Sequence, residues 1–175
     1  IKEENGTWSV VENDPLNRRI TAKTPMKINW DSPIKGATTV IGTLANCSGG
    51  ITPWKTFLTC EENYDNFYGE TIYDQNNNPQ HKPSTYYNWE QFYTYPPEHY
   101  GWVVEINPKD GSSQKHIALG RFAHECCTLY ELEDKRVVAY SGDDANDEHL
   151  YKFISSKPSS LKEGTLYVAD TINGK

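Results

Sequence analysis

The amino-acid sequence predicts an all-β protein, a β-propeller fragment of about two four-stranded blades, part of a preceding blade and an aromatic-rich insertion. Aromatic residues make up 13% of the chain, with 12 Tyr and 5 Trp, and this bias favours strands. The 12 Gly and 10 Pro are spread along the sequence, so turns are frequent and a long helix has little room. The third observation is an internal repeat.

The repeat is found by aligning Gly42 with Gly120. The alignment also pairs Ala45 with Ala123, Asn46 with His124 and Cys47 with Glu125. In each copy a short apolar run and a turn lead to an extended run ending in acidic residues, at 56–62 and 136–144. A strand that begins with an aromatic residue, a glycine-containing turn and a closing strand complete the copy. Each copy is therefore four short strands, and a unit of roughly 40–50 residues has the size of a propeller blade.

The segments of the chain follow from this repeat and together form part of a single propeller domain, residues 1–175. The expected order is the end of a preceding blade at 1–45, a blade at 46–123 with an insertion at 70–100, and a second blade at 124–172. Strands around 8–11 and 19–23 are expected in the first segment. The alternative is an antiparallel sandwich with two similar hairpin pairs. Because a propeller needs at least about four blades to close, we interpret the chain as a fragment.

The insertion is the most aromatic part of the chain. Residues 64–100 contain eleven aromatic side chains together with an Asn76–Asn78 run and Pro96–Pro97. The tract is too polar and too often broken for a core element. We expect it to pack as a cover over the blade, and the alternative is a lid or a contact with a partner.

The charge of the chain limits its partners. The net charge is −7, from 24 acidic and 17 basic residues, whereas a nucleic-acid-binding surface is basic, so we expect no nucleic-acid partner. No apolar stretch approaches the roughly 18 residues of a membrane helix, so no membrane partner is expected. An anionic substrate is compatible with this acidity only if bound cations reverse the local field.

The repeat predicts that acidic and sulfur-containing residues meet at one rim. Adjacent strands of a blade are antiparallel, so the start of the first strand and the end of the second lie at the same edge. The residues at these positions are Asn46–Cys47, Glu61–Glu62, His124–Glu125 and Asp143–Asp144, with Asp147 and Glu148 in the following loop. All of them are expected on one face of the propeller near its axis.

Such a cluster has a specific chemistry. Four or more carboxylates cannot remain ionised together without a counter-charge, and hard cations prefer their oxygens. A thiolate among them favours a transition metal, because calcium takes oxygen ligands. The alternatives are that the acidic pairs are solvated turn residues, that Cys47 is a small buried residue, and that His124 is a core or supporting histidine.

The sequence resembles the PhoX-type alkaline phosphatases over residues 8–169. The motifs that carry the resemblance are Asn46–Trp54 followed by Leu58–Asn63, Asn17–Ala22 with Thr24–Met26, Leu119–Phe122 with His124–Glu125, and Ser141–Asp144 with Glu148 and Tyr151–Phe153. They follow one another in a single order and cover nearly the whole chain. Their combination is more specific than any short motif alone.

The resemblance implies a six-bladed propeller that hydrolyses phosphate esters with a mixed iron and calcium cluster. It implies that Cys47 is an iron ligand, that Glu62 and Glu125 are cluster ligands, and that Asp144 and Glu148 are further candidates. His124 and Asn46 are the predicted catalytic residues. Family members are usually exported through the twin-arginine pathway, so a periplasmic or extracellular location is expected. A later Arg-x-Glu element of the family lies beyond Lys175, so we expect the fragment alone to be inactive. Because two blades leave apolar faces uncovered, we also expect the fragment to self-associate through these open propeller faces.

Two other functions are compatible with an acidic propeller. One is a non-catalytic, calcium-stabilised module that binds a partner through its rim. The other is a calcium-dependent, lactonase-like hydrolase, which also gathers acidic and amide side chains at the axis. Cys47 distinguishes these functions from the phosphatase, because a thiolate contributes little to a calcium-only site.

Overall fold

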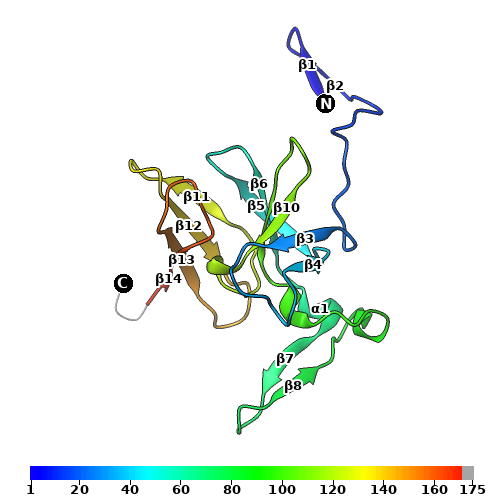
Figure 1. Ribbon diagram of the computed structural model, residues 1–175, viewed down its shortest axis with the longest axis vertical. Coiled ribbons are helices and arrows are strands. Elements are labelled where there is room, and N and C mark those ends of the chain that lie inside the picture. Colours follow the sequence, from blue (N-terminus) through cyan, green and yellow to red (C-terminus); the bar gives the residue numbers. More distant parts are fainter. Residues whose placement is uncertain (171–175) are drawn as a thin grey trace.

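The computed structural model describes residues 1–170 (Figure 1), so the last two positions of the expected second blade lie outside the described residues. The described chain is built mainly of strands, and its longest helix, α1 (Asp65–Tyr68), has four residues. The prediction of an all-β protein is therefore confirmed. Within residues 1–170 no helix is long and apolar enough to cross a membrane.

The second copy of the repeat forms a four-stranded antiparallel sheet. Its strands lie side by side in chain order: β11 (Thr128–Glu131), β12 (Val137–Gly142), β13 (Leu150–Ser155) and β14 (Gly164–Val168). This is the order expected for a blade. The face of this sheet that packs on the rest of the protein carries Val137, Ala139 and Phe153, which are at most 2% exposed.

The first copy forms the main part of a six-stranded sheet. Its spatial order is β4 (Thr39–Ile41), β3 (Pro25–Ile28), β10 (Ser113–His116), β9 (Val103–Ile106), β6 (Phe57–Glu61) and β5 (Asn46–Ile51). The strands of the copy itself, β5, β6, β9 and β10, are antiparallel neighbours in chain order. β3 adds to them by pairing in parallel with β10.

The first 45 residues differ from the expectation. β3 and β4 extend the sheet of the following copy, because Met26, Ile28 and Val40 bury their side chains against Val104 of that sheet. No strand forms at 19–23, where a turn closes by the hydrogen bond from the Thr24 N–H to the Thr21 carbonyl. β1 (Lys2–Glu4) and β2 (Thr7–Ser9) form a hairpin that stands away from the sheets (Figure 1).

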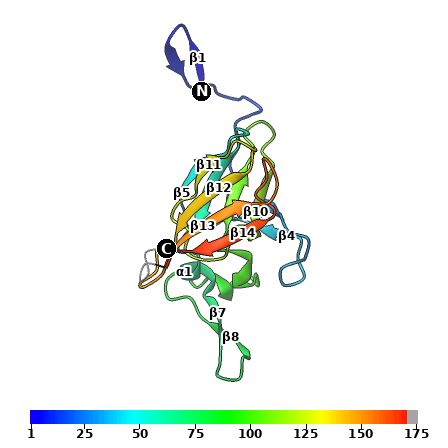
Figure 2. The same cartoon turned by 90° about the vertical axis from the view of Figure 1, so that its left-hand side faces the viewer.

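A core cluster joins the two sheets. Cys60 and Val103 of the six-stranded sheet meet Ala139 and Phe153 of the four-stranded sheet and Cys127, which directly precedes β11. All five are at most 2% exposed. Figure 2 shows the two sheets stacked against each other. This packing is the one that neighbouring blades would have. Two sheets do not close a ring, so the propeller itself stays a prediction.

The insertion lies between β6 and β9 and has two parts. β7 (Glu70–Tyr73) and β8 (Pro79–Lys82) form a hairpin that projects away from the sheets (Figures 1 and 2). The rest, with the short helices η1 (Trp89–Gln91) and η2 (Pro97–His99), packs onto the end of the sheet. The expectation that this tract contains no core element is corrected, because Tyr68 and Tyr100 are buried and stack with their ring centroids 4.8 Å apart. Another short helix, η3 (Ile117–Leu119), follows β10.

Candidate functional site at one rim of the sheets

The two copies of the repeat have the same backbone geometry at the rim. Asn46 at the start of β5 is the register partner of Glu61 at the end of β6, and His124 forms the corresponding bridge with Asp143. One step further, the Glu62 N–H donates to the Ala45 carbonyl at 3.3 Å. The Asp144 N–H donates to the Ala123 carbonyl at 3.1 Å. Corresponding residues of the two copies therefore occupy corresponding places at one end of the two sheets.

The two glycines that the repeat aligns, Gly42 and Gly120, explain why the backbone geometry of the rim recurs in both copies. Gly42 and Gly120 have φ angles of +84° and +89°, a region that residues with a side chain rarely adopt. A Cβ atom on Gly42 would lie 2.1 Å from the carbonyl oxygen of Ala22. The chain therefore needs glycine where it turns toward the rim in each copy.

Cys47 is exposed at the rim and lies close to acidic residues from both copies. The backbone N–H of Ser48 favours its thiolate, but the interaction with Glu62 and the charge of Glu125 outweigh this effect and raise the pKa of Cys47. All four cysteines of the chain are free. Of the residues that the sequence selected as metal ligands, Glu62 thus interacts directly with the Cys47 thiol, and the charge of Glu125 reaches it.

Glu61 and Glu62 are neighbours in the sequence but have different environments. The Glu61 side chain is fully buried, and its carboxylate lies 2.7 Å from the Lys115 ammonium group. Its other oxygen accepts hydrogen bonds from the N–H groups of Gly101 and Trp102, at 3.0 and 3.1 Å. Glu62 is half-buried and remains near Cys47. Of this acidic pair, only Glu62 is available to a ligand at the rim.

The two residues predicted to be catalytic differ in accessibility. Asn46 is exposed, and its amide donates to the Thr43 hydroxyl at 2.7 Å. His124 is fully buried, with Nδ1 2.8 Å from the Ser141 hydroxyl and Nε2 3.0 Å from the Gly120 carbonyl. Burial lowers the pKa of His124 to about 4, although the Gly120 carbonyl opposes this change. The geometry of His124 favours support of the rim loop over contact with a substrate.

A second group of acids follows β12. Asp143 is partly buried, which raises its pKa, and the charges of Glu148 and Asp144 raise it further, against hydrogen bonds from the backbone N–H groups of Ala123 and Ala145. Asp144 and Glu148 themselves are exposed. Within residues 1–170 no three His, Cys, Asp or Glu side chains are arranged to hold one metal ion. The rim therefore offers donor atoms that lie near one another without an assembled ligand shell.

Comparison with known proteins assigns the chain to a family. A sequence model described as alkaline phosphatase PhoX matches residues 1–174. The chain belongs to the PhoX family. A similar solved structure is Pseudomonas fluorescens PhoX in complex with vanadate, a transition state analogue, with 34% sequence identity and a TM-score of 0.78. The alignment covers 95% of this chain and 35% of that PhoX chain, so the chain spans about a third of its relative. A search of curated proteins gave no match.

This member of the PhoX family also has a buried polar network that the sequence analysis missed. Glu105 of β9 accepts hydrogen bonds from Trp54 at 2.6 Å, from Gln114 at 2.8 Å and from the Thr56 hydroxyl, and lies 2.7 Å from His116 Nε2. Burial alone would raise the pKa of Glu105, but these contacts lower it to about 2. The only signal in the sequence was one acid within the apolar run of β9.

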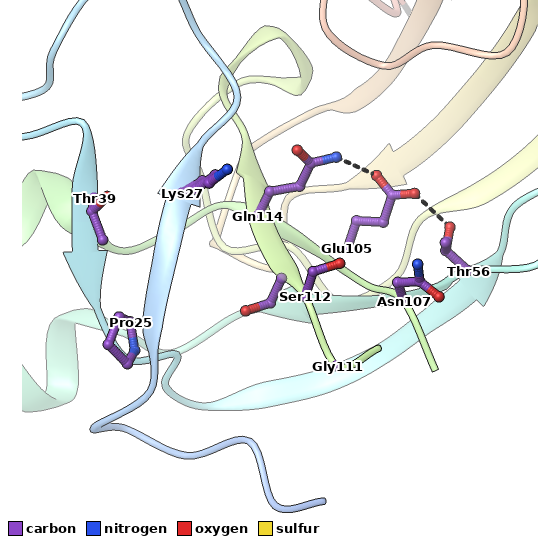
Figure 3. Close-up of a pocket in the computed structure, with 10 residues that line it drawn as sticks. Pro25, Lys27, Thr39, Thr56, Glu105, Asn107, Gly111, Ser112 and Gln114 are labelled. Carbon is purple, nitrogen blue, oxygen red and sulfur yellow. Dashed lines mark hydrogen bonds between the residues drawn. The ribbon is translucent and has the colours of Figure 1, made fainter. Parts of the chain in front are cut away.

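A pocket of about 520 Å³, lined mainly by polar residues, lies beside this network (Figure 3). Lys27 of β3, Gln114 of β10 and Glu105 line it, and Figure 3 shows Gln114 and Thr56 on either side of the Glu105 carboxylate. Both carboxylate oxygens are already occupied by protein donors. Glu105 therefore stabilises the sheet and has little capacity left for a ligand.

Proposed function

We propose that the protein to which this chain belongs is a metal-dependent phosphoester hydrolase of the PhoX type. Membership of the PhoX family and the likeness to a PhoX structure that contains a transition state analogue support the proposal. The observation that carries it is the interaction of Cys47 with Glu62 and with the charge of Glu125, which come from the two copies of the repeat. A phosphate ester is the proposed substrate.

The donor set at the rim fits a mixed metal cluster of iron and calcium. Carboxylates suit calcium, and a thiolate suits iron, so the combination matches both metals. Without a cation, Glu62 and Glu125 raise the pKa of the Cys47 thiol, whereas a nearby cation would favour its thiolate form. Cys47, Glu62 and Glu125 would hold the cluster, with Asp144 and Glu148 as further ligands. Residues outside the described chain would complete it.

The chemistry follows from the charges involved. Bound cations would offset negative charge on the phosphoryl oxygens and make an acidic rim compatible with an anionic substrate. Asn46 is exposed next to Cys47 and is the proposed donor to a substrate oxygen. We propose that His124 keeps the rim loop in place through Ser141 and Gly120. Because further ligands are required, the 175 residues alone are expected to be inactive.

Two measurements on the full-length protein test this function. Elemental analysis is expected to find iron and calcium, and phosphate release from phosphate esters is expected to fall after prolonged treatment with a strong chelator. Full activity in protein shown to be metal-free would contradict the proposal. Calcium without iron would instead favour the calcium-dependent binding module or lactonase-like hydrolase, in which Cys47 has no ligand role.

Export is part of the same proposal. Family resemblance is its support, because exported PhoX proteins use the twin-arginine pathway. Cell fractionation of the native host, with detection of the protein by an antibody, tests it. The protein is expected in the periplasmic or extracellular fraction, and a purely cytoplasmic signal would contradict this location.

A further inference from the structure

The insertion forms an aromatic pocket together with residues 22–23 and Ile41. The pocket has a volume of about 300 Å³, at the lower end of the size of ligand pockets. Its lining consists of four aromatic residues, two aliphatic and one cationic: Tyr68, Trp89, Tyr93, Tyr95, Ala22, Ile41 and Lys23. Lys23 is the one charged residue of this lining. We call this cavity the aromatic pocket.

The walls of the aromatic pocket are held by contacts between the rings. Trp89 packs edge-on against Tyr68 and Tyr93, with ring centroids 6.1 Å apart in both pairs. Tyr95 is stacked with Tyr93 at 6.3 Å and tilted against Tyr68 at 6.2 Å. Behind them, Tyr68 is buried and stacks on Tyr100. Because the rings fix one another, the pocket exists before any ligand enters.

A short stretch of chain and a series of contacts connect the aromatic pocket to the proposed metal site. Leu44 belongs to the buried cluster that contains Tyr68, and two positions later the chain reaches Asn46. The six residues from Ile41 to Asn46 span at most ~18 Å between their terminal Cα atoms, even fully extended. After β6 the chain passes Glu62 and reaches helix α1 at Asp65, three positions later. Tyr68, which lines the pocket, stacks on Tyr100, and the Lys115 ammonium group contacts both the Tyr100 ring and the Glu61 carboxylate at the end of β6. A path of direct contacts therefore joins the pocket to the rim.

The chemistry of the lining indicates what the aromatic pocket binds. Aromatic side chains stack on flat rings, and a lysine beside them attracts anionic or electron-rich substituents. We propose that the aromatic pocket binds the planar aromatic leaving group of the phosphate-ester substrate, either an aryl group or a nucleoside. This inference rests on the proposed function, and it gives that function a preference for aromatic esters over aliphatic ones.

Variants of the full-length enzyme test the preference. Phosphate release is measured with 1-naphthyl phosphate, adenosine 5′-monophosphate and glycerol 2-phosphate. For Tyr93→Ala and Trp89→Ala we expect KM for an aromatic ester to rise about ten-fold, because stacking of one ring typically contributes a factor of this order, and KM for glycerol 2-phosphate to stay unchanged. Phe92→Ala is the matched control, since Phe92 is 75% exposed and does not line the pocket. A response with only one aromatic ester identifies the preferred ring and supports the inference.

A binding measurement separates this inference from the proposed function. Titration calorimetry with 1-naphthol and with adenosine, which carry no phosphate, is expected to show weaker binding to Tyr93→Ala than to Phe92→Ala. Among the aromatic residues that line the pocket, Tyr93 has the most exposed side chain. Its replacement is therefore expected to disturb folding less than replacement of the others. Equal KM changes for aromatic and aliphatic esters, or ring binding unaffected by Tyr93→Ala, would overturn the inference. If no phosphate ester is hydrolysed but ring binding still depends on Tyr93, the proposed function fails and the aromatic site stands.

Discussion

The carboxylate of Glu61 lies 2.7 Å from the ammonium group of Lys115, and neither side chain is exposed. The ammonium group also donates to the His99 carbonyl at 2.8 Å and lies 4.6 Å from the centre of the Tyr100 ring. Burial lowers the pKa of Lys115, while the charge and hydrogen bond of Glu61 oppose this change. The pair connects the strand end at the rim to the end of the insertion.

Glu61→Gln is expected to destabilise the full-length protein by about 3–5 kcal/mol, because it leaves the Lys115 charge buried without its partner. Glu131→Gln is the control. It removes a surface ion pair with Lys135, whose side chain is 65% exposed, and such pairs contribute about 0–1 kcal/mol. The free energy of unfolding in urea measures both. Equal small effects would show that the Glu61–Lys115 pair is not formed.

Cys47→Ser is expected to remove bound iron and phosphatase activity from the full-length enzyme with little change in stability, because the side chain is exposed. Cys126→Ser is the matched thiol control and is expected to keep both. Iron content by elemental analysis and phosphate release are measured on the same samples. Iron retained at the wild-type level in Cys47→Ser would argue against the thiolate ligand.

The lowered pKa of Glu105 predicts that the protein loses folding stability in acid. Its pKa of about 2 in the folded protein lies below the value of 4.5 for a free carboxyl, so its contribution is complete above about pH 4.5 and is lost as the pH falls toward 2. The shift corresponds to about 3 kcal/mol. Glu105→Gln should lack this part of the pH dependence, whereas exposed Glu12→Gln should retain it. Parallel curves of unfolding free energy against pH for wild type and Glu105→Gln would refute the assignment.

Gly42→Ala is expected to cost more than about 1 kcal/mol, since its φ of +84° disfavours a side chain and the new Cβ would lie 2.1 Å from Ala22. Gly142→Ala has open space around the added Cβ and is expected to change stability by less than about 0.5 kcal/mol. Thermal unfolding of both variants compares them directly. Similar melting temperatures would show that the turn at Gly42 adapts easily.

The outer face of the second sheet predicts self-association of residues 1–175 expressed alone. Tyr130, Tyr140, Leu150 and Tyr167 are 44–67% exposed on this sheet. Leu150→Lys should lower the mass measured by light scattering, and Tyr86→Lys, on the insertion, should not. A monodisperse wild-type monomer would contradict the expectation. Phosphate release by the same sample is expected to be absent.

The features that the sequence predicted well are those decided locally. Gly42 and Gly120 both need a positive φ, so their alignment found the true correspondence between the copies. In the second copy each strand pairs with its neighbour in the chain, which is why the order β11 to β14 followed from the pattern alone. The family resemblance was confirmed over nearly the whole chain.

The remainder depends on contacts between distant residues. β3 pairs with β10 across more than eighty positions, and no local pattern selects that partner. The repeat placed Glu61 and Glu62 together at the rim, and only the family resemblance selected Glu62 as a ligand. Burial of Glu61 beside Lys115 now separates the two on physical grounds. The repeat gave the backbone position of His124 beside Asp143. Only the folded structure shows that both ring nitrogens of His124 already have partners, the Ser141 hydroxyl and the Gly120 carbonyl. The roles of the rim residues as ligands stay predictions.

The matched backbone hydrogen bonds of Glu62 and Asp144 have a consequence for the side chains that the two copies can carry. The backbone of each copy is held by its own main-chain contacts and glycine, so the side chains that it presents are free to diverge. At the position shared by Cys47 and Glu125, the same backbone therefore carries sulfur in one copy and oxygen in the other. Asymmetric chemistry can thus arise on a symmetric frame without any new backbone conformation.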